Sequence, residues 1–65
     1  MEKEVTDYYE SAVEMVERLK VDLGCHNNCR EYIVLNEGKR RRGYRVTVIR
    51  LSDGVSMSKF VGETD

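Results

Sequence analysis

Apolar residues recur at intervals of three or four positions along the first third of the chain. This spacing is typical of an amphipathic helix and predicts one over residues 5–23. The apolar stripe consists of Val5, Tyr8, Tyr9, Ala12, Val16, Leu19 and Leu23, with Val13 and Met15 at its margins. Asp7 and Glu10 fit a capping box, with Thr6 as the alternative N-cap residue. Gly24 is expected to end the helix in a left-handed conformation. Because adjacent helical residues point about 100° apart, one of Tyr8 and Tyr9 is expected in the core and the other at its boundary.

Three shorter stretches have the pattern of β-strands. Residues 30–36 contain four consecutive apolar positions, Tyr32 to Leu35, which is typical of a strand covered on both faces. Residues 44–51 and 55–61 alternate between apolar and polar positions. The last residues, 62–65, are expected to form a frayed tail.

The order helix, strand, strand, strand predicts a single α+β domain over residues 1–65, with the helix packed on a three-stranded antiparallel meander. Ser52-Asp53-Gly54 marks the second hairpin, whose register has two solutions. A two-residue turn places Met57 on the face of Val46 and Val48, whereas a glycine-bulge turn aligns Val55 and Met57 with Leu51 and Ile49.

A chain of 65 residues buries only about 60% of its unfolded surface, so its own core is small. One helix covers one face of the sheet, and we expect the other face to meet a second subunit or a partner protein. That face is expected to expose some of Ile33, Leu35, Ile49, Leu51 and Phe60. A homodimer is therefore predicted. The sequence has no apolar run of transmembrane length and no signal-peptide core, so a soluble cytoplasmic protein is expected.

The net charge of −1 is unevenly divided. Residues 1–24 hold seven acids and three bases, a net of −4, whereas residues 25–65 hold eight bases and five acids, a net of +3. Basic residues gather at the first hairpin, beside Tyr44: Lys39, Arg40, Arg41, Arg42 and Arg45. These side chains suit the carboxylates of a protein partner or the phosphates of a nucleic acid. A loop that only keeps the protein soluble is the third interpretation.

Cys25, His26 and Cys29 carry ligand types that suit zinc, but the chain has no other Cys or His to complete a four-ligand structural site. We therefore interpret the cysteines as free thiols and expect no cofactor. The single histidine has no partner at a spacing that indicates catalysis, and no phosphate-binding glycine loop is present. The chain is predicted not to be an enzyme.

The run from Asp7 to Lys59 resembles the first part of a double-stranded RNA-binding domain, which also places a helix before three antiparallel strands. Residues of similar type are Tyr32, Glu37-Gly38, Tyr44, Val46, Val48 and Gly54. That family has a second helix whose lysine-rich start grips phosphates, and no stretch of this sequence corresponds to it. The chain is not assigned to the family.

The sequence therefore predicts a small regulatory protein that inhibits a partner macromolecule by stoichiometric protein–protein interaction, by analogy with phage-encoded inhibitors of similar size. The predicted contacts are Lys39 to Arg42, Tyr44 and Arg45. A nucleic-acid-binding module that uses the same hairpin is the alternative. In a further alternative, acids on the helix imitate nucleic acid and block a basic groove: Glu10, Glu14, Glu17 and Asp22.

Overall fold

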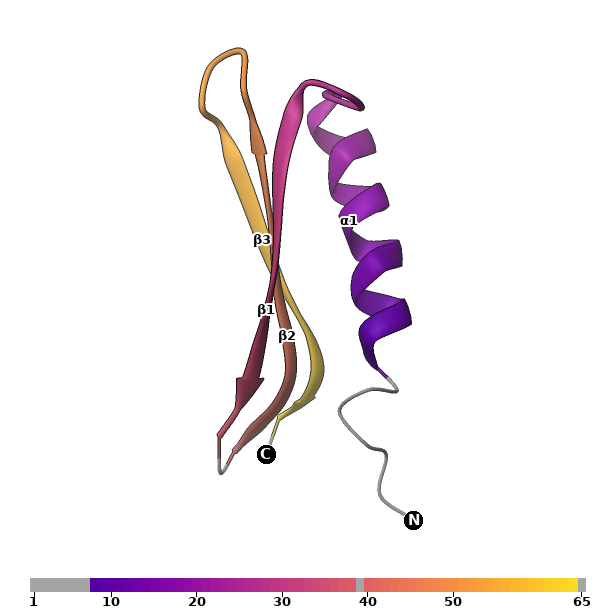
Figure 1. The fold of residues 1–65 in the computed structure, drawn as a ribbon, viewed down its shortest axis with the longest axis vertical. Coiled ribbons are helices and arrows are strands. Elements are labelled where there is room, and N and C mark those ends of the chain that lie inside the picture. The colour runs from indigo at the N-terminus through magenta and orange to yellow at the C-terminus, as the bar shows by residue number, and fades with distance from the viewer. Residues whose placement is uncertain (1–7, 39, 65) are drawn as a thin grey trace.

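The computed structural model describes residues 8–38 and 40–64, except for the side chain of Thr64. It contains one helix, α1 (Tyr9–Leu23), followed by three strands, β1 (Cys29–Glu37), β2 (Arg41–Arg50) and β3 (Ser56–Thr64). The strands form one antiparallel sheet in the order β1-β2-β3, and α1 lies along one side of it (Figure 1). The predicted α+β class and element order are confirmed.

The helix α1 turns its apolar stripe toward the sheet and buries Ala12, Val16, Leu19 and Leu23. It ends where predicted, because Gly24 has a left-handed φ of 65° and its N–H donates to the carbonyl of Val21 at 3.0 Å. Tyr8 occupies the N-cap position without a side-chain capping bond. The predicted helical residues Val5 to Asp7, with the Thr6 and Asp7 caps, lie outside the described residues.

The core lies between α1 and the middle of the sheet. Val46 and Val48 of the central strand are fully buried, and Leu19 packs on them from the helix. Burying a side chain of this size contributes about 1.5–3 kcal/mol relative to leaving it exposed. Tyr8 is half-buried and Tyr9 is exposed, so both tyrosines lie at the margin of this core and neither is inside it.

The register of the second hairpin places Met57 opposite Val48, on the covered face, as the first of the two predicted solutions has it. The turn itself is longer than two residues. Arg50 donates its N–H to the carbonyl of Val55 at 2.7 Å, and Gly54 donates to the carbonyl of Arg50 at 2.8 Å. Residues 51–54 therefore form the loop, and Val55 precedes β3.

Two strand boundaries differ by three residues from the sequence-based expectation, and the other four differ by one residue. The second strand begins at Arg41 instead of residue 44, and the third continues through residues 62–64, which were expected to fray. The reason lies in Gly43 and Gly62, which pair directly across the two strands. A Cβ on Gly43 would lie 2.2 Å from the carbonyl oxygen of Val61, so the missing side chains let the backbones approach and extend the sheet.

The side chains of the three strands alternate between the helix-covered face and the opposite face, called here the open face. Pairing with the covered Tyr44 and Val46 puts Leu35 and Ile33 on the covered face, which corrects the expectation for these two residues. Ile49 and Phe60 do lie on the open face. Leu51 lies in the turn, outside both faces.

Candidate binding surface

The open face is a continuous surface to which all three strands contribute side chains. Its residues follow from the pairing of each strand with β2. They are Arg30, Tyr32, Val34 and Asn36 of β1; Arg41, Gly43, Arg45, Thr47 and Ile49 of β2; and Ser56, Ser58, Phe60, Gly62 and Thr64 of β3. No described helix or strand covers this face (Figure 1).

Contacts within the open face confirm the assignment of its side chains. The hydroxyls of Thr47 and Ser58 are hydrogen-bonded across β2 and β3 at 2.9 Å. The guanidinium carbon of Arg41 lies 5.4 Å from the ring centroid of Phe60, within cation–π range. Gly43 and Gly62 lie between the rows of these two residues, so no side chain separates the arginine from the ring.

The open face carries charge of one sign. Arg30, Arg41 and Arg45 are exposed on it, and no acidic residue lies on it among the described residues. Apolar side chains occupy the space between the arginines: Tyr32 is 45% exposed and Val34 is 55% exposed. Val34 lies directly opposite Arg45, so apolar and cationic groups alternate across the strands.

The basic stretch singled out in the sequence does not form one cluster. Arg41 and Arg45 point to the open face, whereas Arg42 and Tyr44 point to the covered face. The Tyr44 ring packs edge-on against Tyr9 with centroids 5.5 Å apart, so it belongs to the margin of the core. Arg40 is exposed in the turn, and Lys39 lies outside the described residues.

The acidic residues of the helix are exposed, but their charge is mixed with that of neighbouring bases. At helical spacing, Arg18 lies between Glu14 and Asp22 on a stripe that begins with Glu10, while Glu17 lies to one side of it. Lys20 also lies 3.6 Å from a carboxylate oxygen of Glu17. The helix surface is therefore less uniform in sign than the open face.

Lys20 connects the helix to the sheet. Its Nζ lies 2.7 Å from Glu31 of β1, and its side chain is only 17% exposed. The hydrogen bond to Glu31 is the main cause that raises the pKa of Lys20, and the charge of Glu17 adds to it. This lysine is committed to holding α1 on β1, which removes it from the charges available to a partner.

Cys25, His26 and Cys29 lie around the helix-to-strand turn. Cys25 is buried, Cys29 is half-buried with its Sγ donating to the carbonyl of His26 at 3.2 Å, and His26 itself is exposed. Burial raises the pKa of the Cys29 thiol, and its neighbour Cys25 adds to the shift. Among residues 8–38 and 40–64, no three His, Cys, Asp or Glu side chains are grouped to hold a metal ion.

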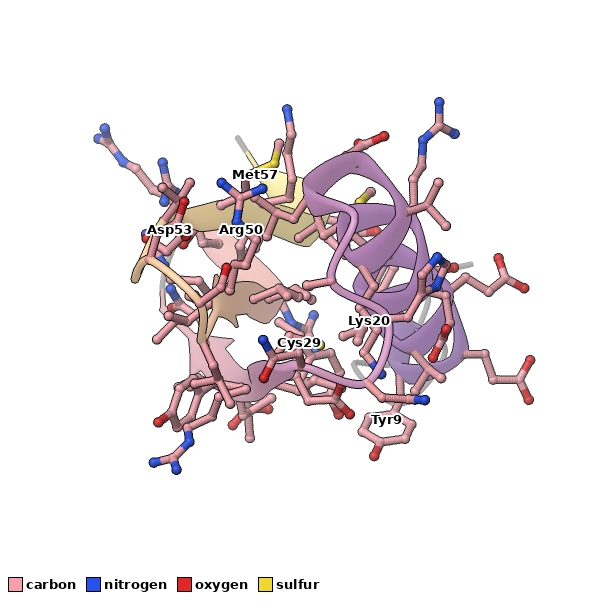
Figure 2. All side chains as sticks on the ribbon, turned by 90° about the horizontal axis from the view of Figure 1, so that it is seen from above. Tyr9, Lys20, Cys29, Arg50, Asp53 and Met57 are labelled. Carbon is pink, nitrogen blue, oxygen red and sulfur yellow. The ribbon has the colours of Figure 1, made fainter. Side chains whose placement is uncertain are left out.

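Arg50 joins the C-terminal end of α1 to the loop between β2 and β3, a role that the sequence analysis missed. One guanidinium nitrogen donates to the carbonyl of Leu23 at 2.7 Å, at the C-terminus of α1. The other two donate to both carboxylate oxygens of Asp53, at 2.9 and 2.6 Å (Figure 2). Arg50 lowers the pKa of Asp53 to about 2. The three-residue spacing of Arg50 and Asp53 around a turn is the only signal in the sequence.

Comparisons of the chain with models of known protein families, with curated proteins and with solved structures find no match. The described helix is neither long enough nor apolar enough to cross a membrane.

Proposed function

We propose that this chain is a non-enzymatic binding protein that regulates or inhibits a partner protein by covering part of its surface with the open face of its sheet. One observation carries the proposal. Three exposed arginines surround exposed apolar side chains on a face without acidic residues in the described part of the chain. The partner surface that complements this face is acidic with an apolar centre.

The chemistry of the open face supports a protein surface as the partner. Arginine forks bind carboxylates with two parallel hydrogen bonds, and tyrosine and arginine are the residue types enriched at the energetic centres of protein interfaces. Val34 and Ile49 supply aliphatic area between the arginines, which suits the apolar core of such an interface.

Two features favour a protein over a nucleic acid as the partner. Binding of single strands relies on several aromatic rings that are free to stack on successive bases, whereas Tyr32 is the one free ring among the described residues of the open face, because Arg41 covers the ring of Phe60. The chain also has a sequence pI near 5.8, whereas nucleic-acid-binding domains are usually basic. Acids on the helix side repel phosphates that extend beyond the open face.

The test compares two double variants with the same change in net charge. Arg30→Ala with Arg45→Ala removes cations from the open face, whereas Arg18→Ala with Lys59→Ala removes cations from the helix side. A protein captured from a cell extract by the immobilised native chain is purified and titrated with the native chain and both variants by calorimetry. We expect the open-face variant to bind at least about 100-fold more weakly, because each of the two arginines loses a charged hydrogen bond that contributes about 1.5 kcal/mol or more. The helix-side variant should retain native affinity.

Equal loss in both variants would contradict the open face as the site and indicate an effect of net charge alone. Mixed 20-nucleotide RNA and DNA, single-stranded and duplex, are titrated in parallel at about 50 and 200 mM salt. Tight binding that weakens steeply with salt would overturn the protein-partner proposal in favour of the nucleic-acid alternative.

A further inference from the structure

The first strand has an unpaired edge. Among the described residues, β1 pairs only with β2. Gly38 donates its N–H to Arg41 at 2.7 Å, and Leu51 donates to the carbonyl of Asn28 at 3.0 Å. Hydrogen-bonded and non-hydrogen-bonded pairs alternate in antiparallel ladders. These two bonds therefore show that the N–H and C=O groups of the even-numbered residues of β1 point toward β2. The N–H and C=O groups of the odd-numbered residues, Ile33 and Leu35 among them, point away from the sheet.

The edge formed by β1 is more apolar than the edge formed by β3. Tyr32, Val34 and Leu35 of β1 are all about half exposed, at 45%, 55% and 51%. By contrast, no large apolar side chain of β3 is among the exposed ones, and small or charged residues make up most of that strand: Ser56, Ser58, Lys59, Gly62 and Glu63. Natural sheets protect free edges with charges and small or irregular residues. The centre of β1 lacks this protection.

We infer that two copies of this chain join through β1, antiparallel about a two-fold axis at Ile33, into one six-stranded sheet. Ile33 is the central residue of β1 (Cys29–Glu37), so this register pairs the whole strand with its copy. It also puts the outward-pointing backbone groups of odd residues opposite each other, for roughly ten new hydrogen bonds.

The side chains agree with the same register. Tyr32 lies opposite Val34 of the second copy on both sides of the axis, so the exposed apolar groups cover each other. Arg30 lies opposite Asn36 of the second copy, and no two charges of the same sign are directly opposed. Pairing the two open faces with each other is disfavoured, because it brings six arginines together without an acid from the described residues.

Joining the edges completes the surface proposed above as the binding site. A two-fold axis perpendicular to the sheet leaves both open faces on the same side. One open face of three strands measures about 30 by 14 Å, or about 420 Å² in projection. A stable interface needs about 800 Å² per partner, which two joined faces provide. The use of the doubled surface as a binding site rests on the proposed function, whereas the pairing of β1 rests on the backbone geometry and exposed side chains of that strand.

The first test measures the mass of the native chain and of two proline variants by sedimentation and light scattering, from about 1 to 500 µM. Leu35→Pro removes an outward N–H from β1, and Ser56→Pro is the matched change on the edge of β3. We expect a dimer for the native chain and for Ser56→Pro. Dimerisation of Leu35→Pro should be about 100-fold weaker, because the lost hydrogen bond counts twice in a symmetric dimer. A native chain that stays monomeric throughout, or a dimer broken only by Ser56→Pro, would overturn the inference.

A second measurement needs no variant and covers the case in which Leu35→Pro does not fold. Amide hydrogen exchange of the native chain is followed by NMR at low and high concentration. Exchange at Ile33 and Leu35 should slow as the concentration rises, while exchange at the outward amides of Phe60 and Gly62 should not change. Fast exchange at Ile33 in a sample that is dimeric by sedimentation would contradict pairing through β1.

The two proposals fail in different ways. If β1 does not pair, the native chain is a monomer or a dimer that Leu35→Pro does not weaken, and its sensitivity to Arg30→Ala with Arg45→Ala remains. If the open face does not bind a protein, both double variants bind alike, and the dimer remains.

Discussion

The two faces of the sheet are made by the same strands, yet they differ in almost every property. On the covered face, Val46 and Val48 are fully buried under α1. The residues on either side of Val46 belong to the open face: Arg45 is exposed there, and the hydroxyl of Thr47 is hydrogen-bonded to that of Ser58. A strand of period two can therefore stabilise the fold with alternate residues and leave the others for a partner.

Charge follows the same division. Ion pairs on the covered side join elements of the fold, as Lys20 does with Glu31 and Arg50 with Asp53. The arginines of the open face have no acidic neighbour on that face among the described residues. The binding role proposed for the open face rests on this difference between paired and unpaired charge.

The largest expected loss of stability comes from adding a side chain where β2 and β3 approach most closely. Gly43→Ala puts a Cβ 2.2 Å from the carbonyl oxygen of Val61 and 2.7 Å from the Cα of Gly62, at a φ of 157° that side chains rarely adopt. We expect a loss of about 3 kcal/mol in the free energy of unfolding, measured by urea denaturation. Gly38→Ala is the control, since its Cβ meets nothing closer than 3.8 Å. Similar stability of the two variants would contradict the close strand contact.

One substitution made on each face compares them directly. Val46→Ala removes methyl groups from the core and should cost about 2–3 kcal/mol of unfolding free energy, since a cavity is left behind. Val34→Ala, on the open face, should cost less than about 1 kcal/mol. Equal losses by urea unfolding, at a concentration where the chain is monomeric, would mean that the open face is covered within the folded monomer.

The division into faces was only partly predictable from the sequence. Helical spacing and the alternation of Tyr44, Val46 and Val48 are enough to predict the element order, whereas the face of the sheet that meets the helix cannot be read from them. The sequence alone predicts that the run of basic residues lies at the tip of a hairpin, because the contact of Gly43 with Gly62, which extends the strands, joins two positions far apart in the chain. Because β2 begins at Arg41, the alternation of side chains along the strand places Arg41 on the open face and Arg42 on the covered face.

Continuous apolar runs were harder to interpret. The four residues Tyr32 to Leu35 have no alternation, so the sequence could not say which pair meets the helix. The contacts of Arg50 could not be predicted either, because its hydrogen bond to the carbonyl of Leu23 joins residues 27 positions apart. Such contacts depend on how the helix lies on the sheet.

A smaller effect on the covered side is expected from acid. Arg50 and the N–H of Val55 hold the pKa of Asp53 at about 2, below its usual 3.8. Because the folded-state pKa is lowered, the stabilisation is present above pH 3.8 and is lost as the pH falls toward about 2. Asp53→Asn should be less stable than the native chain at neutral pH, and the difference should shrink across this window in urea titrations. A difference that does not change with pH would contradict the ion pair.

The smallest effect concerns a thiol on the covered side. Burial, followed by the neighbouring Cys25, raises the pKa of Cys29, so little thiolate forms near neutral pH. Iodoacetamide should modify Cys29 more slowly in the folded chain than in the urea-unfolded chain at pH 8, as followed by mass spectrometry. Cys25→Ser, which leaves one thiol, isolates the reaction. Equal rates in the two states would contradict a half-buried thiol with a raised pKa.

The central claim, that the open face is the binding surface, is tested most directly with two tyrosines of similar exposure. Tyr32 lies on the open face and is 45% exposed, while Tyr9 lies on the helix and is 48% exposed. Hydroxyl-radical labelling of both rings is measured by mass spectrometry, at one chain concentration, with and without the captured partner protein. The account predicts that the partner protects Tyr32 and leaves Tyr9 labelled as before. Protection of Tyr9 with unchanged labelling of Tyr32 would contradict it and assign binding to the acidic helix.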